Sequence, residues 1–316
     1  MPSRQKLHPA KAYEEGKRRI SEAASQSATR LDLHDLPLSR IPPEIGSLVH
    51  LEVLLLGNRV FTGESWDDWG WASSPVPKTF SDLSPLAGLT ALRDLDLTEC
   101  KRLVTVELPS TLVALKRVDM SECGRLTSLK IPNTLDCLEH LDLSGCLHLT
   151  SFSLPANLGR LRHLDLRECE RLLTLGGGQG LGGLRHLDIG FCKRLSDFDS
   201  IGESPDLQYL DLSYCRRLDS VNFLKKLRTL RHLDLSGCER LASLDAVADL
   251  PLLQHLDLGD CTKVRSFAPV KSLLGHIDEV YLSGCCFDDL DPMLYGKFLE
   301  NVANHVRTHF AIPVRK

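Results

Sequence analysis

Three kinds of side chain that could carry chemistry recur along this 316-residue sequence at a fixed interval. Cysteines recur every 23 residues, with one last step of 24, at Cys100, Cys123, Cys146, Cys169, Cys192, Cys215, Cys238, Cys261 and Cys285. Aspartates recur at the same step, at Asp96, Asp119, Asp142, Asp165, Asp188, Asp211, Asp234 and Asp257. Histidines lie two residues before many of them, at His140, His163, His186, His232 and His255. Thiols in a row could form disulfides, and imidazoles beside carboxylates could bind a metal ion or titrate near neutral pH.

The three rows belong to one repeating unit. LEHLDLSGCLHL begins at Leu138, LRHLDLRECERL at Leu161 and LRHLDIGFCKRL at Leu184, so the step is 23 residues. A repeat of this length predicts a solenoid in which each coil contacts only its neighbours. The alternation over the first six places predicts one strand in each coil, with the first, fourth and sixth side chains facing the core. Prolines later in the coil exclude long helices there and favour short helical turns or extended segments.

The repeat divides the chain into three parts. Residues 1–27 are predicted to hold a capping helix that runs from Pro9 to about Ser25. Residues 28–287 are predicted to form about eleven coils, interrupted by an insert within 59–90. Residues 288–316 are predicted to hold a second capping helix, ended by Pro313, because apolar residues recur there every four positions.

The cysteine row points to a reducing compartment. Equivalent places in neighbouring coils lie about 4.8 Å apart, a distance that a disulfide could bridge. Because such a row would be a hazard in an oxidising compartment, we expect reduced, buried thiols and a cytoplasmic protein. The first 20 residues have no apolar core of the kind found in secretory signals, and no apolar run is long enough to predict a membrane span.

The histidine and aspartate rows allow two interpretations. On each strand the second, third and fifth side chains are expected on the concave face, so an imidazole row runs beside a carboxylate row. One interpretation is a metal ribbon or a pH switch; the other is that each carboxylate is neutralised by an imidazole or by an arginine such as Arg162. A ladder supplies only open ligand sets, and no CxxC pair typical of zinc sites occurs, so we expect no metal and no cofactor.

The eleventh place of most coils is basic and predicts a positive stripe along one rim. Its arginines are Arg102, Arg125, Arg171, Arg194, Arg217 and Arg240. The stripe could follow phosphate groups, or its side chains could cover apolar surface while their charged ends pair with neighbouring glutamates. Aromatic side chains do not interleave with the stripe and the net charge is −4, so a protein partner is favoured over nucleic acid, and no membrane attraction is expected.

Aromatic residues that depart from the repeat predict the partner site. Phe191 and Tyr214 stand at the eighth place, where Glu and Gly predominate, and Tyr209 stands where histidine is usual. With Arg167, they come from three successive coils and are expected to form one patch, because large aromatics and arginine dominate interface hot spots. The alternative is that neighbouring aromatic rings only pack on one another.

The insert is the second departure from the repeat. It contains all three tryptophans of the chain, Trp66, Trp69 and Trp71. One interpretation is a lid that packs on the second and third coils, and the other is an exposed partner-binding loop.

The pattern LxxLxLxxCxxL, over about residues 28–287, resembles that of leucine-rich-repeat proteins, with cysteine where asparagine is more usual. The segments EEGKRRISEAASQSATRLDLHDLPLSRIPPEI and SDLSPLAGLTALRDLDL resemble bacterial intracellular repeats, and LxHLDLSGCxxL resembles the repeats of plant intracellular immune receptors. The resemblance implies an α/β fold, a right-handed horseshoe with a parallel sheet on its concave face. It also implies ligand recognition rather than catalysis.

The sequence therefore predicts a protein–protein recognition module and no enzyme. The resemblance favours the sensing or adaptor component of an intracellular signalling or immunity system, although the GxxxxGK[ST] loop of those receptors' nucleotide switch does not occur. The alternative is a nucleic-acid or phosphate-ligand binder that uses the basic rim. The sequence makes no prediction about the oligomeric state.

Overall fold

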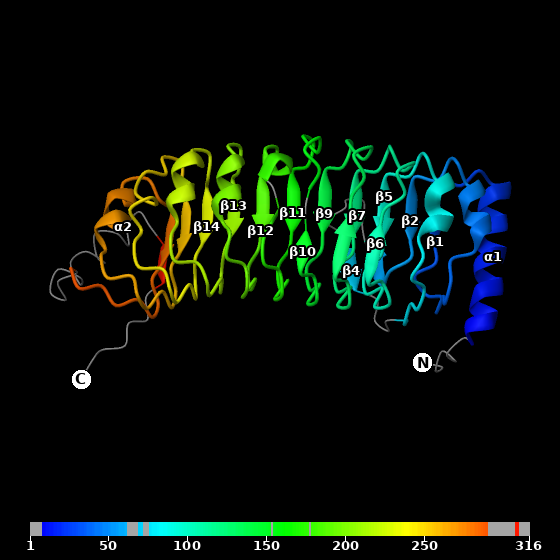
Figure 1. The fold of residues 1–316 in the computed structure, drawn as a ribbon, viewed down its shortest axis with the longest axis horizontal. Coiled ribbons are helices and arrows are strands. Elements are labelled where there is room, and N and C mark those ends of the chain that lie inside the picture. Colours follow the sequence, from blue (N-terminus) through cyan, green and yellow to red (C-terminus); the bar gives the residue numbers. More distant parts are fainter. Residues whose placement is uncertain are drawn as a thin grey trace. The chain divides into compact units, whose positions relative to one another are not determined.

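The computed structural model describes residues 8–61, 69–71, 76–152, 154–176, 178–289 and 307–309. The chain forms two compact units, Met1–Leu161 and Arg162–Lys316, and the division falls where a predicted coil begins. Figure 1 shows that each unit places its strands side by side in chain order. Each unit is therefore a solenoid with a parallel sheet.

The strands of the main sheets begin at the third place of each predicted coil. Those of the first unit are β1 (Arg30–Asp32), β2 (Val53–Leu55), β5 (Asp94–Asp96), β7 (Arg117–Asp119) and β9 (His140–Asp142). Those of the second are β11 (His163–Asp165), β12 (His186–Asp188), β13 (Tyr209–Asp211), β14 (His232–Asp234), β15 (His255–Asp257), β16 (Glu279–Tyr281) and β17 (Arg307–His309). All eleven predicted coils thus carry a strand. Within each unit the register pairs third place with third place and fifth with fifth, as in His186↔Tyr209 and Asp188↔Asp211. Residues that recur every 23 positions in the sequence therefore form columns across the strands. The side chains at the third and fifth places of each coil lie on one face of the sheet, which is called the strand face below.

The core is formed by the places that the repeat predicted. In the coil that begins at Leu138, the first, fourth and sixth side chains are all fully buried, and so is Cys146. The same places are buried in the coils that begin at Leu92 and later, so the apolar interior there is a stack of equivalent leucine layers.

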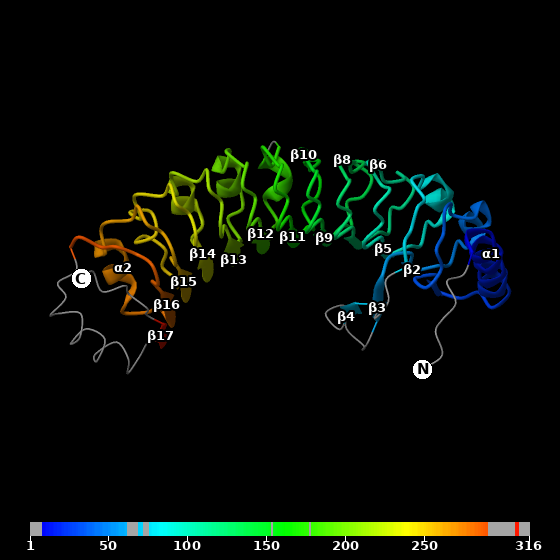
Figure 2. The same cartoon turned by 90° about the horizontal axis from the view of Figure 1, so that it is seen from below.

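The return segments are short, as the prolines predicted. They contain the 3₁₀ turns η1 (Pro43–Ser47), η2 (Ser84–Gly88), η3 (Gly178–Leu181), η4 (Asp199–Glu203) and η5 (Asn222–Lys226), and one α-helical segment, α2 (Ala268–Leu273). In the first unit β6 (Thr105–Glu107), β8 (Ser128–Lys130) and β10 (Ser151–Phe152) form a second parallel sheet. Figure 2 shows this sheet on the side opposite the strand face.

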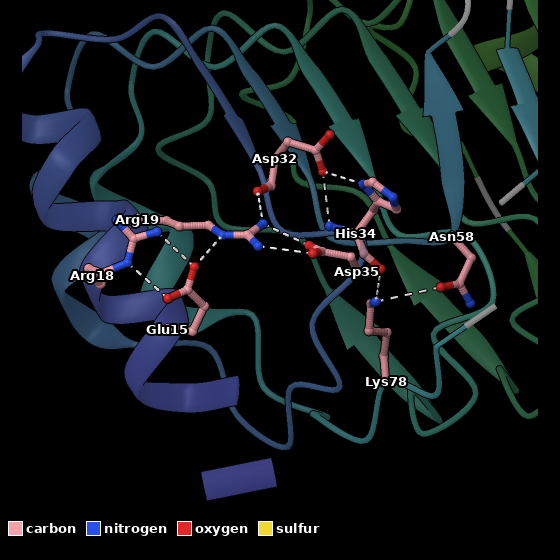
Figure 3. Close-up of polar contacts among 8 residues, drawn as sticks. All are labelled: Glu15, Arg18, Arg19, Asp32, His34, Asp35, Asn58 and Lys78. Carbon is pink, nitrogen blue, oxygen red and sulfur yellow. Dashed lines mark hydrogen bonds and ion pairs between the residues drawn. The ribbon is translucent and has the colours of Figure 1, made fainter. Parts of the chain in front are cut away.

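The N-terminal helix α1 (Pro9–Ser25) has the predicted bounds. It buries Ala12, Gly16, Ile20 and Ala23 against the first coil. Figure 3 shows the hydrogen bonds that join the helix to the first coil. The Arg19 guanidinium donates to both carboxylate oxygens of Asp35, at 2.7 and 2.9 Å, and to Glu15 on the same helix at 3.0 Å. Hydrogen bonds from Arg18 and Arg19 lower the pKa of Glu15 to about 2.

The prediction of a helix up to Pro313 is wrong for residues 307–309. These residues form β17, which pairs in parallel with β16. The main-chain groups at the open edge of β16 offer a ready template for another strand, and this long-range pairing overrides the four-residue periodicity. The rest of the predicted second capping helix lies outside the described residues.

The insert begins with an antiparallel pair, β3 (Arg59–Phe61) and β4 (Trp69–Trp71), which projects on the strand-face side of the first unit (Figure 2). Trp66 lies outside the described residues. The chain returns through Lys78, which is 1% exposed and donates to the main-chain oxygen of His34 (Figure 3). Asn58 Oδ1 accepts from Val76 N at 3.1 Å and lies 3.5 Å from Lys78 Nζ. A buried polar cluster therefore fixes the end of the insert to the first two coils.

The cysteines are free, and those of the row are buried. Most row thiols donate to a main-chain oxygen 26 residues earlier, as Cys123 does to Leu97 at 3.2 Å and Cys261 to Leu235 at 3.0 Å. Burial raises the pKa of Cys238 to about 12, so its thiol stays protonated at neutral pH.

We predict that an aromatic disulfide reagent labels few of the row cysteines before unfolding, because protonated buried thiols react slowly. The partly exposed Cys137 and Cys286 should react first. A Cys137→Ser, Cys286→Ser variant should therefore show almost no labelling in the native state and full labelling in denaturant. Rapid labelling of most thiols of this variant in the native state would contradict the prediction.

Lys78 generates a second prediction. Burial lowers its pKa to about 8, whereas an unfolded lysine titrates at about 10.4. Between these values the unfolded chain binds the extra proton, so this lysine makes folding more favourable as the pH rises. Lys78→Met should therefore raise the free energy of unfolding more at about pH 7 than at about pH 10, by roughly 2–3 kcal/mol, as measured by urea unfolding.

The buried thiols weaken folding at alkaline pH in both proteins, so only the difference between variant and parent is informative. The exposed Lys130, paired with Glu107 at 2.7 Å, supplies the control. Lys130→Met should change stability by nearly the same small amount at both pH values. An equal effect of the two substitutions would show that Lys78 is not desolvated.

Candidate binding face

A column of stacked rings crosses the strand face of the second unit. His163 stacks on His186 with centroids 3.9 Å apart, His186 on Tyr209 at 4.0 Å, and Tyr209 on His232 at 4.4 Å. His255 continues the column at 5.6 Å with a tilted ring. Because the ring faces cover one another, the column presents its edges, with the ring nitrogens and the Tyr209 hydroxyl, to a partner. Burial lowers the pKa of His232 and raises the pKa of Tyr209 to about 12. Both rings are therefore neutral near pH 7.

The stacking also limits metal binding. The adjacent imidazoles of His163 and His186 are parallel within 8°, so their nitrogens lie in parallel planes and do not converge on an ion between the two rings. In the part of the chain that the structure describes, no three His, Cys, Asp or Glu residues are grouped to hold a metal ion.

The aspartate column lies beside the rings and has a local structural role. In the second unit each Oδ1 accepts the main-chain N–H two residues later, at 2.7–2.9 Å, from Arg167, Gly190, Ser213, Ser236 and Gly259. Aspartate commonly makes this bond in turns. Neither interpretation of the sequence included it, although an aspartate two residues before a turn-forming residue was a usable signal.

Three of these carboxylates, those of Asp188, Asp234 and Asp257, have raised pKa values and resist ionisation. Burial, followed by the charge of Asp211, raises the pKa of Asp188 to about 6. Burial also raises the pKa of Asp234 to about 6 and that of Asp257 in the same direction. The column is therefore an electrostatically unfavourable arrangement in the isolated protein.

In the coils that begin at Leu92 and later, the eighth place adopts a left-handed backbone conformation. The φ angle is +61° at Phe191 and +55° at Tyr214, and it is also positive at Gly237 and Gly284. Left-handed backbone costs an L-residue roughly 1–2 kcal/mol, a cost that glycine avoids at Gly145, Gly237 and Gly284 but that Glu99, Glu122 and Glu168 also incur. Phe191 and Tyr214 therefore occupy positions that the fold disfavours for them, and such strain clusters at functional sites.

The predicted patch resolves into two separate ring arrays. Phe191 and Tyr214 stack on each other with centroids 4.6 Å apart, and the Tyr214 ring also covers Gly237. Tyr209 instead belongs to the histidine column. Arg167 is exposed and follows β11. The four residues thus share one face, and the rings do pack on one another, but Phe191, Tyr209 and Tyr214 remain partly exposed.

The basic rim is exposed. Arg102, Arg125, Arg171, Arg194 and Arg217 form no ion pair among the described residues, and Arg240 lies 3.7 Å from Asp219. The neighbouring tenth place is paired instead, as in Lys193–Glu170 at 2.5 Å and Arg216–Glu239 at 3.6 Å. A shallow depression of about 480 Å³, lined by residues of η2 and β6, lies in the first unit away from all of these side chains.

Parallel strands in equal register, buried leucine layers and short returns define a repeat solenoid whose chemistry lies on its surface. Residues 82–176 match, in six copies, the family described as BspA type leucine rich repeat region, and residues 226–247 match a leucine rich repeat family. The chain is a leucine-rich-repeat protein. Leucine-rich-repeat folds typically act as non-enzymatic scaffolds that bind protein partners.

Solved structures agree on the fold. A leucine-rich-repeat protein of Leptospira interrogans is 21% identical, with a TM-score of 0.55 over 89% of this chain and 72% of that chain. An internalin (inlF) of Listeria monocytogenes is 15% identical, with a TM-score of 0.60 over 95% of this chain and 89% of that chain. At these identities the similarity shows the fold alone. No curated protein sequence matches the chain.

The left-handed place generates a prediction about stability. Phe191→Gly removes a stacked ring worth about 0.5–1.5 kcal/mol and relieves backbone strain of similar size. We expect the free energy of unfolding to stay within about 1 kcal/mol of the parent in urea titrations.

The matched control is Tyr209→Gly, because Tyr209 also stacks on neighbouring rings but lies within a strand, where glycine brings no relief. The Tyr209→Gly substitution should lower the free energy of unfolding by about 1–2 kcal/mol. If Phe191→Gly proved as costly as Tyr209→Gly, Phe191 would not be strained.

Proposed function

We propose that the strand face of the second unit binds a protein partner, and that the protein serves as the sensing or adaptor component of a cytoplasmic signalling or defence system. The observation that carries the proposal is the pair Phe191–Tyr214, two large rings kept at left-handed positions that disfavour them. Partly exposed aromatics of low conformational entropy are the side chains that dominate protein interfaces. The Tyr209 hydroxyl and the ring edges of the histidine column add directional hydrogen-bonding groups beside them.

The rings of Phe191, Tyr209 and Tyr214 are partly exposed, which fits a binding surface. None of the described helices has both the length and the apolar composition needed to span a bilayer.

A second candidate function uses the basic rim. The five arginines that form no ion pair among the described residues come from two neighbouring coils of the first unit and three neighbouring coils of the second, and phosphate groups of a nucleic acid or another ligand could neutralise them. Salt distinguishes the two functions: phosphate contacts lose affinity steeply as salt rises, whereas an aromatic hot spot does not.

The test begins with identification of a partner by cross-linking in the native cell, followed by calorimetry with the purified partner. Tyr209→Ala together with Tyr214→Ala should weaken binding at least about tenfold, because truncation of an aromatic anchor commonly costs about 2 kcal/mol or more. The melting temperature should shift by only a few degrees, since these side chains point away from the leucine core.

Two controls accompany this pair. Tyr209→His with Tyr214 intact should keep the ring column, because histidine stands at this place in neighbouring coils. This variant tests the contribution of the Tyr209 hydroxyl to binding separately from that of the stacked ring. Arg102→Ala with Arg125→Ala changes the rim of the other unit and should leave binding intact. If the rim substitutions abolished binding while the tyrosine substitutions did not, the strand-face proposal would be wrong.

A further inference from the structure

We propose that the partner presents lysine or arginine side chains on an extended segment that lies across the strand face of the second unit, over Asp188, Asp211, Asp234 and Asp257. This inference rests on the proposed function and names the chemistry of the partner. It follows from the surface formed jointly by the ring column, the aspartate column and the Phe191–Tyr214 pair.

Asp188, Asp211, Asp234 and Asp257 in the aspartate column lack an ion pair with a lysine or arginine in the part of the chain that the structure describes. The four carboxylates follow one another at the strand spacing of about 4.8 Å, and each uses Oδ1 for a main-chain N–H. Asp188 is only 6% exposed, so its charge is poorly solvated as well as unpaired.

Nearby arginines are directed elsewhere. Arg162 donates to the main-chain oxygen of Gly183 at 2.9 Å, and Arg231 donates to the side chain of Gln254 at 3.3 Å. The Arg167 guanidinium lowers the pKa of Asp188, but burial and the Asp211 carboxylate outweigh it. A partner's cations would therefore neutralise charges that the chain itself leaves uncompensated.

The residues beside the aspartates keep the surface above them open. The seventh place carries Gly190, Ser213, Ser236 and Gly259 in these coils. A Cβ at Gly190 would lie 2.7 Å from Ser213 Oγ and 3.0 Å from Asp211 Oδ1. A larger side chain there would cover the carboxylates, so small residues at this place preserve access to them.

Rings flank the aspartates at the two ends of the strands. The histidine and tyrosine edges at the third place lie on one side, and Phe191 with Tyr214 at the eighth place on the other. The column from Asp188 to Asp257 spans about 14 Å, and alternate side chains of an extended segment lie about 6.7 Å apart. Such a segment can therefore place two or three cations over the column, with its other groups against the rings.

Binding should depend on pH with a defined sign. A cation stabilises the ionised carboxylate, so binding releases the protons that Asp188 and Asp234 hold below their pKa of about 6. The groups that face them are the carboxylates of Asp165, Asp211 and Asp257, the guanidinium of Arg167, and the imidazoles of His163, His186, His232 and His255.

The experiment uses the full chain and a fluorescent peptide of alternating lysine and threonine residues, followed by fluorescence anisotropy. The test variant is Asp188→Asn with Asp211→Asn, because asparagine keeps the Oδ1 acceptor of the turn and removes only the charge. The matched control is Asp119→Asn with Asp142→Asn in the first unit, which changes the net charge equally and keeps the same turn bonds.

We expect the test variant to weaken peptide binding at least about tenfold and the control to change it less than about twofold. Affinity of the parent should fall as the pH is lowered from about 7.5 to about 5.5. Equal losses in both variants would reveal attraction to bulk negative charge only, and no loss in the test variant would overturn the proposal. A glutamate–threonine peptide that bound as tightly would overturn it too.

The native partner separates this inference from the proposed function. If Tyr209→Ala with Tyr214→Ala abolishes native binding while Asp188→Asn with Asp211→Asn leaves it intact, the face binds a partner but the cationic chemistry is wrong. If neither pair affects native binding, the proposed function fails first.

Discussion

The turn that ends each strand is the constraint on which the rest of the structure depends. Two hydrogen bonds and one backbone angle define this turn. The aspartate Oδ1 accepts the main-chain N–H two residues later, and the eighth residue adopts a positive φ. The N–H of the cysteine that follows donates to the carbonyl of the sixth residue, as Cys215 does to Leu212 at 3.1 Å. The eighth N–H also bonds across to the next coil, as Tyr214 does to Ser236 at 2.7 Å. The turn therefore sends the cysteine inward and leaves the eighth side chain on the surface.

This constraint explains why the same columns hold both structural and candidate binding groups. An aspartate needs only one oxygen for the turn, so its second oxygen and its charge remain available. Asparagine would make the same turn bond without a charge. The carboxylates of the second unit therefore add to the fold a charge that the turn does not require, at a cost that comes mainly from burial and partly from mutual repulsion, which together raise the pKa of Asp188 and Asp234.

The sequence predicted the features that repeat and missed those that depend on single long-range contacts. The bounds of α1, the coil starts and the buried places followed from periodicity, because each coil repeats one pattern of apolar side chains. The candidate partner-binding residues were chosen as departures from that pattern, but the left-handed backbone of Phe191 and Tyr214 and the separation of the rings into two arrays were not predicted. The pairing of 307–309 with β16 and the burial of Lys78 depend on contacts with distant coils, and no local pattern encodes such contacts.

The strain at Phe191 and Tyr214 bears on how specific the face can be. In a solenoid each exposed side chain is defined by its place and its coil, so one substitution alters one element of a column and leaves the leucine layers unchanged. The two rings support each other by stacking, which offsets part of the backbone cost that each would incur alone. The two rings together therefore destabilise the fold less than the sum of their separate backbone costs. They also supply a rigid aromatic anchor at one position along an otherwise regular acidic column. A charge column alone would accept a cationic segment in several registers, whereas this anchor favours one of them.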